Sequence, residues 1–339
     1  MNVITQKPIS GPAKSFAAQC LLAIGMAALA TGPGRAADWK PAANVEIVIP
    51  SGPSGGLDVA GRIIKNQFDK AQLVSVTSIV INKPGAGGSL AYQYLNQFPG
   101  NGHYFALATS AMVTNKLMGI GKIGPDDLTM ISKLFSDNIV VLVRADSPLK
   151  DARALVARLR ENPRSLSLGI ATALGGANHI ALATALKAAG VDVRNTLNVV
   201  YKSGGDAMIG LLSGDVEVFP VAVSAAVGNL KSGRVRALAI ASTRRMGGEL
   251  ASIPTWREQG IPADYAAWRV IVGPRGLDQD QVRYWDTVMS KLSTLPDWKA
   301  ALDRGYSVGE YLNNRDTREF VEQQLRSHRA ILGDLGLEQ

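Results

Sequence analysis

One unit repeats along this chain and constrains its fold: a short β-branched run, a glycine-rich loop, and then apolar residues at helical spacing. It occurs four times. The predicted strands are 45–49, 76–82, 166–171 and 197–201, and the predicted helices that follow them are 57–70, 89–97, 177–189 and 206–213. Further runs at 216–221 and 235–242 flank a predicted helix at 224–231, and 278–336 is predicted to be largely helical. Strands that alternate with helices indicate an α/β fold with a largely parallel sheet.

The four loops read SGPSGG, KPGAGG, TALGG and KSGG. One such loop could simply be a tight connection that needs glycine. Four of them at the carboxyl ends of parallel strands, where ligands bind in open α/β sheets, predict a shared cleft. Backbone N–H groups at helix starts favour an anion. The loops match neither the Walker motif nor the dinucleotide fingerprint, so we expect no nucleotide site.

The first 36 residues have the features of a secretory signal peptide. Lys7 and Lys14 precede an apolar run at 16–30, and small residues precede a predicted cut after Ala36. The run is shorter than the roughly 20 residues of a membrane-spanning helix. Lipid attachment at Cys20 is disfavoured because most of the apolar run follows that residue. We therefore expect an exported, periplasmic protein.

The remaining chain is long enough for two domains and has no cysteine, so its own core must stabilise it. Removing Lys7, Lys14 and Arg35 lowers the formal net charge from +8 to +5. This charge is dispersed, with no basic run interleaved with aromatics, so we expect no nucleic-acid partner. A mild positive bias suits an anionic solute, although solubility alone would explain it.

Residues for catalysis are sparse. The only histidines are His103, His179 and His328, and the sequence has no Gly-x-Ser-x-Gly elbow and no metal-binding motif. We expect no catalytic residues, no metal and no cofactor. For His179 a hydrogen bond to the backbone is favoured over a ligand contact. For Asp58 fixing the loop is favoured over accepting a hydrogen bond from a ligand hydroxyl, because a carboxylate repels an anion.

Eight segments carry a resemblance to a known family: PSGGLD (53–58), NKPGAGG (82–88), RADSP (144–148), NHIA (178–181), YKSGGDA (201–207), SGDVEV (213–218), GRVRALA (233–239) and IPTWREQG (253–260). In this order they resemble the Bug-type, or TctC-like, solute-binding proteins of tripartite tricarboxylate transporters. The resemblance extends over essentially the whole chain after the signal peptide.

The resemblance implies a type II periplasmic binding protein fold with two α/β lobes and an interlobe cleft. The expected lobes are 37–139 with 244–339, and 140–243, after a signal peptide at 1–36. The implied function is a monomeric receptor that captures a small anionic organic acid and delivers it to the membrane permease subunits of the transporter. Citrate, a dicarboxylate or an aromatic acid all remain open as ligands.

The resemblance also implies ligand-binding roles for residues of the glycine-rich loops and of one further loop after the run YFALA. They are Ser51, Gly52, Ser54, Gly55, Gly56, Asp58, Gly85, Ala86, Gly87, Gly88, Thr109, Ser110, Thr172, Gly175, Gly176, Asn178, His179, Tyr201, Gly204 and Gly205. Arg269 stands where relatives tend to have an aromatic residue. It either faces the cleft and binds a second carboxylate or lies at the surface on a strand edge.

Two alternatives stay open at this point. A sensor that presents its ligand to a membrane kinase would share the fold and the ligand. A secreted α/β hydrolase using the same cleft would gain support if Ser51 or Ser54 lay beside His179.

Overall fold

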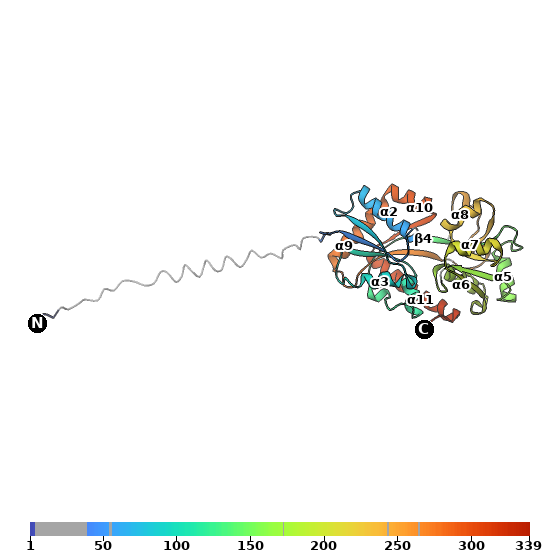
Figure 1. Cartoon of the computed structure of the whole chain (residues 1–339), viewed down its shortest axis with the longest axis horizontal. Coiled ribbons are helices and arrows are strands. Elements are labelled where there is room, and N and C mark those ends of the chain that lie inside the picture. The colour runs from blue at the N-terminus through green and yellow to red at the C-terminus, as the bar shows by residue number, and fades with distance from the viewer. Residues whose placement is uncertain (4–38, 54–55, 172, 243, 264) are drawn as a thin grey trace. The chain divides into compact units, whose positions relative to one another are not determined.

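The structure is a computed structural model that describes residues 1–3, 39–53, 56–171, 173–242, 244–263 and 265–339 (Figure 1). The chain divides into two compact units, Met1–Trp39 and Lys40–Gln339. In the first unit only residues 1–3 and 39 are described, so the predicted signal peptide, with its cut after Ala36, lies outside the described residues. The helices and strands of the described chain all belong to the second unit.

A mixed sheet forms the centre of Lys40–Gln339. Its main path has the order β10-β4-β9-β3-β1-β2, and β7 and β8 also pair with β4. β1 is parallel to β2 and β3, whereas β3 with β9 and every pairing of β4 is antiparallel. The bounds are β1 Val45–Ile49, β2 Ser78–Asn82, β3 Tyr104–Ala108, β4 Thr129–Arg144, β7 Phe219–Ala222, β8 Val235–Ala241, β9 Ala266–Gly273 and β10 Ser307–Leu312.

Helices cover both faces of the first lobe, which comprises β1, β2, β3, β9, β10 and the first part of β4 (Figure 1). On one face, the ring of Trp285 lies 6.3 Å from that of Phe68 and 4.9 Å from that of Phe105. On the other face, Phe320 lies 5.8 Å from Trp268. The first face carries α2 Gly56–Lys70, α9 Gln279–Thr294 and α10 Pro296–Arg304, and the second carries α3 Ser89–Leu95, α4 Ala111–Leu117 and α11 Asn314–Leu335.

The second lobe consists of β5, β6, β7, β8 and the last part of β4. β5 and β6 are parallel, and an isolated parallel bridge between Leu168 and Val218 connects β5 to the segment that enters β7. The further elements are β5 Ser167–Ala171, β6 Leu197–Tyr201, α5 Ala152–Glu161, α6 Ala177–Ala188, α7 Gly204–Ser213 and α8 Val223–Lys231. Short 3-10 turns lie at η1 Ala86–Gly88, η2 Pro125–Asp127, η3 Val193–Asn195, η4 Gly248–Leu250 and η5 Arg257–Gln259.

β4 belongs to both lobes. Its residues 129–138 pair with β9, and residues 139–144 pair with β8. Its 16 residues are almost all buried, because helices or strands pack against it along its length. The change of partner between Asn138 and Ile139 lies beside the predicted lobe boundary at 139/140. The predicted boundaries stay a prediction, and residue 243 at the second one lies outside the described residues.

The strands and helices of the repeated units lie where the sequence predicts them, within a few residues. The sequence did not predict β4 as one long strand, and its antiparallel pairings differ from the largely parallel sheet that was expected. The reason is topological. β4 runs from the first lobe into the second, and on the returning chain β8 pairs with its last part and β9 with its first part.

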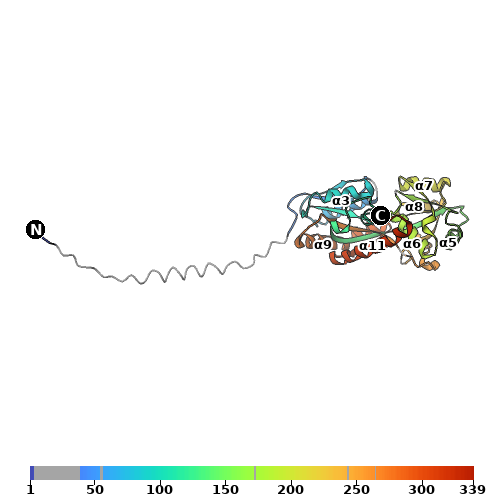
Figure 2. The same ribbon diagram turned by 90° about the horizontal axis from the view of Figure 1, so that it is seen from below.

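The last helix, α11, contacts both lobes. Near its carboxyl end, Asp334 forms an ion pair with Lys187 of α6. The backbone N–H of Gln339 donates to the carbonyl of Leu117 at the end of α4, at 3.0 Å. Figure 2 shows α11 running toward α6. Within the described residues, none of the helices combines the length and the apolar character that crossing a membrane requires.

Trp285 allows a test of the first-lobe core. It is fully buried, and its indole N–H donates to the carbonyl of Gly102 at 2.8 Å. We expect Trp285→Ala to lower the free energy of unfolding by about 3–5 kcal/mol, measured by urea denaturation. Trp285→Phe keeps a ring and loses this hydrogen bond, so it should cost about 1–3 kcal/mol. Equal losses in the two variants would contradict the assignment of Trp285 as a packed core residue.

Candidate ligand-binding site

The first glycine-rich loop is held to its neighbours by Asp58 and Asn82. Asp58 lies in the first turn of α2 and is 2% exposed. The amide nitrogen of Asn82, at the end of β2, donates to the carbonyl of Ser51 at 3.0 Å and to Asp58 Oδ1 at 2.9 Å. Arg62 donates to Asp58 Oδ2 at 2.9 Å. These contacts are the ones that loop fixing requires, and a ligand contact by Asp58 stays a prediction.

The second loop packs against the first. A side chain on Gly88 would come within 2.9 Å of Pro50, which ends the first strand run. Ala86 has a φ of 46°, and Gly85, Gly87 and Gly88 also have positive φ. This loop is therefore a compact left-handed turn. Asn115 of α4 donates through its amide nitrogen to the carbonyls of Ala86 and Gly87 at 3.1 and 3.0 Å.

Neither asparagine was among the site residues predicted from the sequence. Asn115 also donates to the hydroxyl of Ser89 at 3.0 Å, so one α4 side chain fixes the second loop and the start of α3. An asparagine has a low propensity for a helix interior, and this local mismatch is the signal that could have marked Asn115. Asn82 ends a strand directly before a glycine-rich loop, which is also a position where a polar side chain can hold the loop.

Thr109 and Ser110 follow β3. The N–H of Thr109 donates to the Tyr92 hydroxyl oxygen at 3.4 Å, and the Thr109 hydroxyl accepts from the N–H of Ala111 at 3.2 Å. Ser110 is 2% exposed and accepts a hydrogen bond from the hydroxyl of Tyr265 at 3.2 Å. Burial raises the pKa of Tyr265 to about 12, so its hydroxyl stays protonated and remains a donor. Tyr265 was likewise not predicted from the sequence.

The third loop is anchored by His179. The N–H of Gly175 donates to Nδ1 of His179 at 2.9 Å, so Nδ1 is the acceptor and Nε2 carries the proton. Burial lowers the pKa of His179 to about 4, and the imidazole is neutral at pH 7. The sequence favoured such a hydrogen bond to the backbone over a ligand contact. A ligand contact through Nε2 of His179 stays a prediction. Gly176 precedes α6, Asn178 lies in its first turn, and Thr172 lies outside the described residues.

The third loop is where the predicted site meets the other lobe. Gly175 has a φ of 73°, and a side chain there would come within 2.5 Å of Met118 and 3.4 Å of Leu332. Met118 ends α4 and Leu332 lies on α11, both in the first lobe. The structure therefore brings this second-lobe loop against the helix that follows Thr109 and Ser110.

The fourth loop leads into α7. The hydroxyl of Ser203 accepts from the N–H of Asp206 at 3.1 Å and caps the helix. Within the described part of the chain, the N–H groups of Gly204 and Gly205 at the helix start have no acceptor. The half-buried side chain of Tyr201 packs beside Gly210 of the same helix.

The loop glycines fall into two groups. Gly85, Gly87, Gly88 and Gly175 have positive φ, so the backbone itself requires glycine there. Gly52, Gly56 and Gly204 have no positive φ, and among the described residues that are not their chain neighbours none has a heavy atom within 4 Å of where their Cβ would be. Neither strain nor packing explains these three, and their bare backbone is open to a ligand. Ser54 and Gly55, between Gly52 and Gly56, lie outside the described residues.

Arg269 is engaged by the protein. Its Nη2 donates to Asp137 Oδ2 at 2.6 Å, and its Nη1 donates to the carbonyls of Ala267 and Trp268 at 2.7 and 3.1 Å. Its side chain is 14% exposed, so it is not a simple surface arginine. Binding of a second carboxylate by Arg269 stays a prediction, and such a ligand would compete with Asp137.

The structure gives little support to acid–base chemistry at these loops. The hydroxyl of Ser51 donates to the carbonyl of Gly52 at 3.4 Å, and Nδ1 of His179 accepts from Gly175, so these atoms do not engage each other. Across the described ranges, no three His, Cys, Asp or Glu side chains group in a way that could hold a metal ion.

The sequence matches the profile described as tripartite tricarboxylate transporter family receptor over residues 62–337. A Cupriavidus necator protein, named the UPF0065 protein in the gbd 5' region, is 28% identical over 330 residues, covering 96% of this chain and 97% of that protein. A Rhodopseudomonas palustris structure with adipate has a TM-score of 0.75 at 23% identity and covers 88% of this chain and 99% of that one. The structure of MatC from the same species, with bound malate, has a TM-score of 0.72 at 21% identity. It covers 86% of this chain and 99% of that one. These likenesses confirm the expected type II fold and favour neither the hydrolase nor the sensor.

The neutral state of His179 predicts a pH dependence of stability. Its folded pKa of about 4 is below the ordinary 6.5, so the unfolded chain binds this proton more readily. Neutral His179 therefore adds to the free energy of unfolding. This contribution is complete above pH 6.5, is lost as the pH falls toward 4, and amounts to about 3 kcal/mol. Urea denaturation between pH 7 and 4 should show a smaller loss in His179→Gln than in the wild type.

The comparison with the variant is needed because burial also lowers the pKa of His328, so His328 also makes the stability fall as the pH is lowered. Gln at position 179 can still accept from the N–H of Gly175. An identical pH profile in the two proteins would show that His179 is not the buried neutral group described.

Proposed function

This chain belongs to the tripartite tricarboxylate transporter receptor family, as its loop motifs predicted, and from that premise we propose that it is a periplasmic receptor for a small carboxylate. It captures its ligand between the two lobes and delivers it, as a monomer, to the membrane permease subunits of such a transporter. A signal peptide cut near Ala36 exports it. Structures of the same fold that hold malate and adipate make a dicarboxylate our first choice of ligand.

The observation that carries this proposal is the open backbone at Gly52, Gly56 and Gly204. Gly56 begins α2 in the first lobe, and Gly204 begins α7 in the second. Helix starts have free N–H groups and a partial positive charge, which suit a carboxylate. Each lobe thus supplies one helix start to the proposed carboxylate site.

The energetics suit reversible capture. A buried carboxylate is costly unless its oxygens have donors. Hydrogen bonds to a charged group contribute about 1.5–3 kcal/mol each, and a micromolar affinity needs about 8 kcal/mol in total after ordering costs. A few donors from each lobe therefore suffice. Closure follows because the bound ligand gains its second set of contacts only when the lobes meet.

A thermal-shift screen tests the proposal. The chain without residues 1–36 is mixed with adipate, malate, citrate and an aromatic acid, and with the methyl esters of the same acids. We expect at least one free acid to raise the midpoint, because ligand at 100 times Kd stabilises the folded state by about 2.7 kcal/mol. If no acid raises the midpoint and an ester is hydrolysed, the enzyme alternative replaces this one.

A substitution at Gly204 tests the proposed ligand contact of the fourth loop. We expect Gly204→Ala to weaken binding of the best acid at least tenfold, measured by titration calorimetry, because the methyl group covers the N–H groups at the start of α7. The free energy of unfolding should change by less than about 0.5 kcal/mol, since the site is open and unstrained.

Gly228→Ala is the matched control for this substitution. Gly228 also lies on a helix, α8, with no heavy atom within 4 Å of the place that its Cβ would take, and it is not in a predicted loop. Equal affinity in Gly204→Ala and Gly228→Ala would contradict the assignment of the fourth loop.

A further inference from the structure

A cavity lies where the two lobes meet, and we call it the junction cavity. Its volume is about 390 Å³, in the size range of small-ligand pockets. Lys133, Tyr265 and Gln324 line it from the first lobe, Thr184 lines it from α6 of the second, and Arg244 lines it from the segment that follows β8. Its lining includes none of the residues that the sequence predicted for the cleft. Tyr265 connects the two places, because its hydroxyl donates to Ser110.

Lys133 contributes no free charge to the junction cavity. Its ammonium group lies 2.7 Å from Glu310 Oε2 and 4.5 Å above the ring of Phe320. Glu310 Oε2 also accepts from the hydroxyl of Ser136 at 2.5 Å. The charges of Lys133 and Glu310 therefore neutralise each other within the protein. His328 is 1% exposed, and its Nδ1 donates to the carbonyl of Gln324 at 2.7 Å, so its ring is engaged as well.

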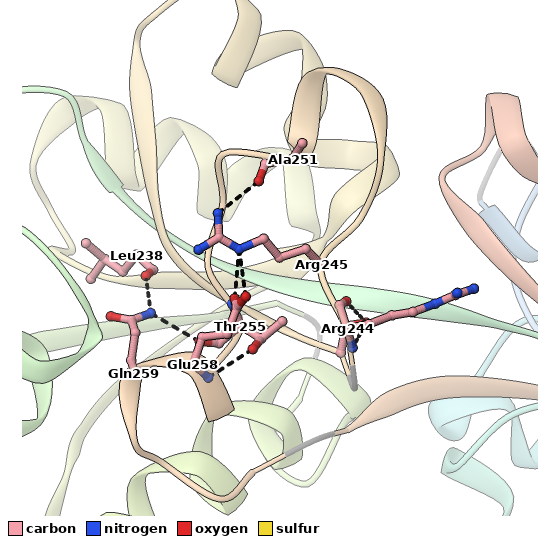
Figure 3. A network of polar contacts seen from close by, with 8 residues as sticks. Leu238, Arg244, Arg245, Ala251, Thr255, Glu258 and Gln259 are labelled. Carbon is pink, nitrogen blue, oxygen red and sulfur yellow. Dashed lines mark hydrogen bonds and ion pairs between the residues drawn. The ribbon is translucent and has the colours of Figure 1, made fainter.

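Arg244 is different. Its side chain is exposed, and among the described residues its guanidinium has no hydrogen-bond or ion-pair partner. The neighbouring Arg245 donates to both oxygens of Glu258 at 2.9 Å and to the carbonyl of Ala251 at 3.1 Å. Figure 3 shows the two side chains pointing in opposite directions, with Arg244 extending along β4. Arg245 thus fixes the segment, and Arg244 directs an unpaired cation into the cavity.

Polar groups on the first-lobe wall face the same space. Gln324 accepts from the indole N–H of Trp268 through Oε1 at 3.1 Å, which leaves its amide NH₂ as a donor. Ser327 lies on α11 and also lines the cavity. Its hydroxyl has no partner among the described residues. The cavity therefore offers a guanidinium from the segment after β8 and neutral donors from α11.

We propose that the junction cavity is a second binding site, for a small oxyanion, with Arg244 as its charged anchor. A planar guanidinium binds the paired oxygens of a carboxylate or a phosphate bidentately. Gln324 and Ser327 would donate to the oxygens on the far side. Because the walls come from both lobes, an occupant would link them through contacts separate from those of the cleft loops.

Titration calorimetry with inorganic phosphate, and separately with malonate, tests this site. We expect one of these probes to bind the wild type, and the probe that binds identifies phosphate or carboxylate as the preferred group. Arg244→Gln should weaken that binding at least tenfold, and Ser327→Ala about threefold. Gly204→Ala should leave it unchanged. Arg326→Gln is the matched control, because Arg326 is an exposed α11 residue that does not line the cavity.

Three results would overturn the site: no binding of either probe, binding that Arg244→Gln leaves intact, or equal losses in Arg244→Gln and Arg326→Gln. A loss caused by Gly204→Ala alone would place the probe in the cleft and also reject the second site, while leaving the proposed receptor function standing. An unchanged urea midpoint in Arg244→Gln shows that the variant is folded, as expected for an exposed side chain.

Discussion

The backbone pairing of β4 is the interaction on which the rest of this structure depends. One strand supplies hydrogen-bond partners to β9 and β10 in the first lobe and to β7 and β8 in the second. Because the strand is continuous and buried, the two lobes share one sheet rather than a loose linker. The pairing partner of β4 changes between Asn138 and Ile139, from β9 to β8.

Within this frame, side chains fix the loops and leave part of their backbone bare. Asn82 and Asn115 hold the first and second loops through hydrogen bonds to carbonyl oxygens, and His179 holds the third by accepting an N–H. Ser203 caps α7. The polar side chains named here are thus used to hold the loops.

Arg244 and Arg245 show how differently two neighbouring residues of one type can act. Glu258 and a backbone carbonyl satisfy Arg245, which makes it part of the structure that connects β8 to β9. Arg244 has no such partner among the described residues and points along β4 at the lobe junction (Figure 3). Arg269 resembles Arg245 in this respect, since Asp137 and two carbonyls already occupy its guanidinium. Partners, rather than residue type, separate a structural arginine from one available to a ligand.

Sequence alone determined the elements whose information is local. Alternation of β-branched runs, glycine loops and helical apolar spacing located β1, β2, β5 and β6 and the helices after them, because side-chain periodicity and turn residues within one short segment mark such elements. The family motifs lie in the same local units. The tertiary structure decided what depends on distant parts of the chain: the antiparallel pairing of β4, the role of Asn115, the pairing of Arg269 with Asp137, and a guanidinium of Arg244 that has no partner among the described residues. These partners lie far apart along the chain, and burial of the sheet faces selects them only when the whole chain packs.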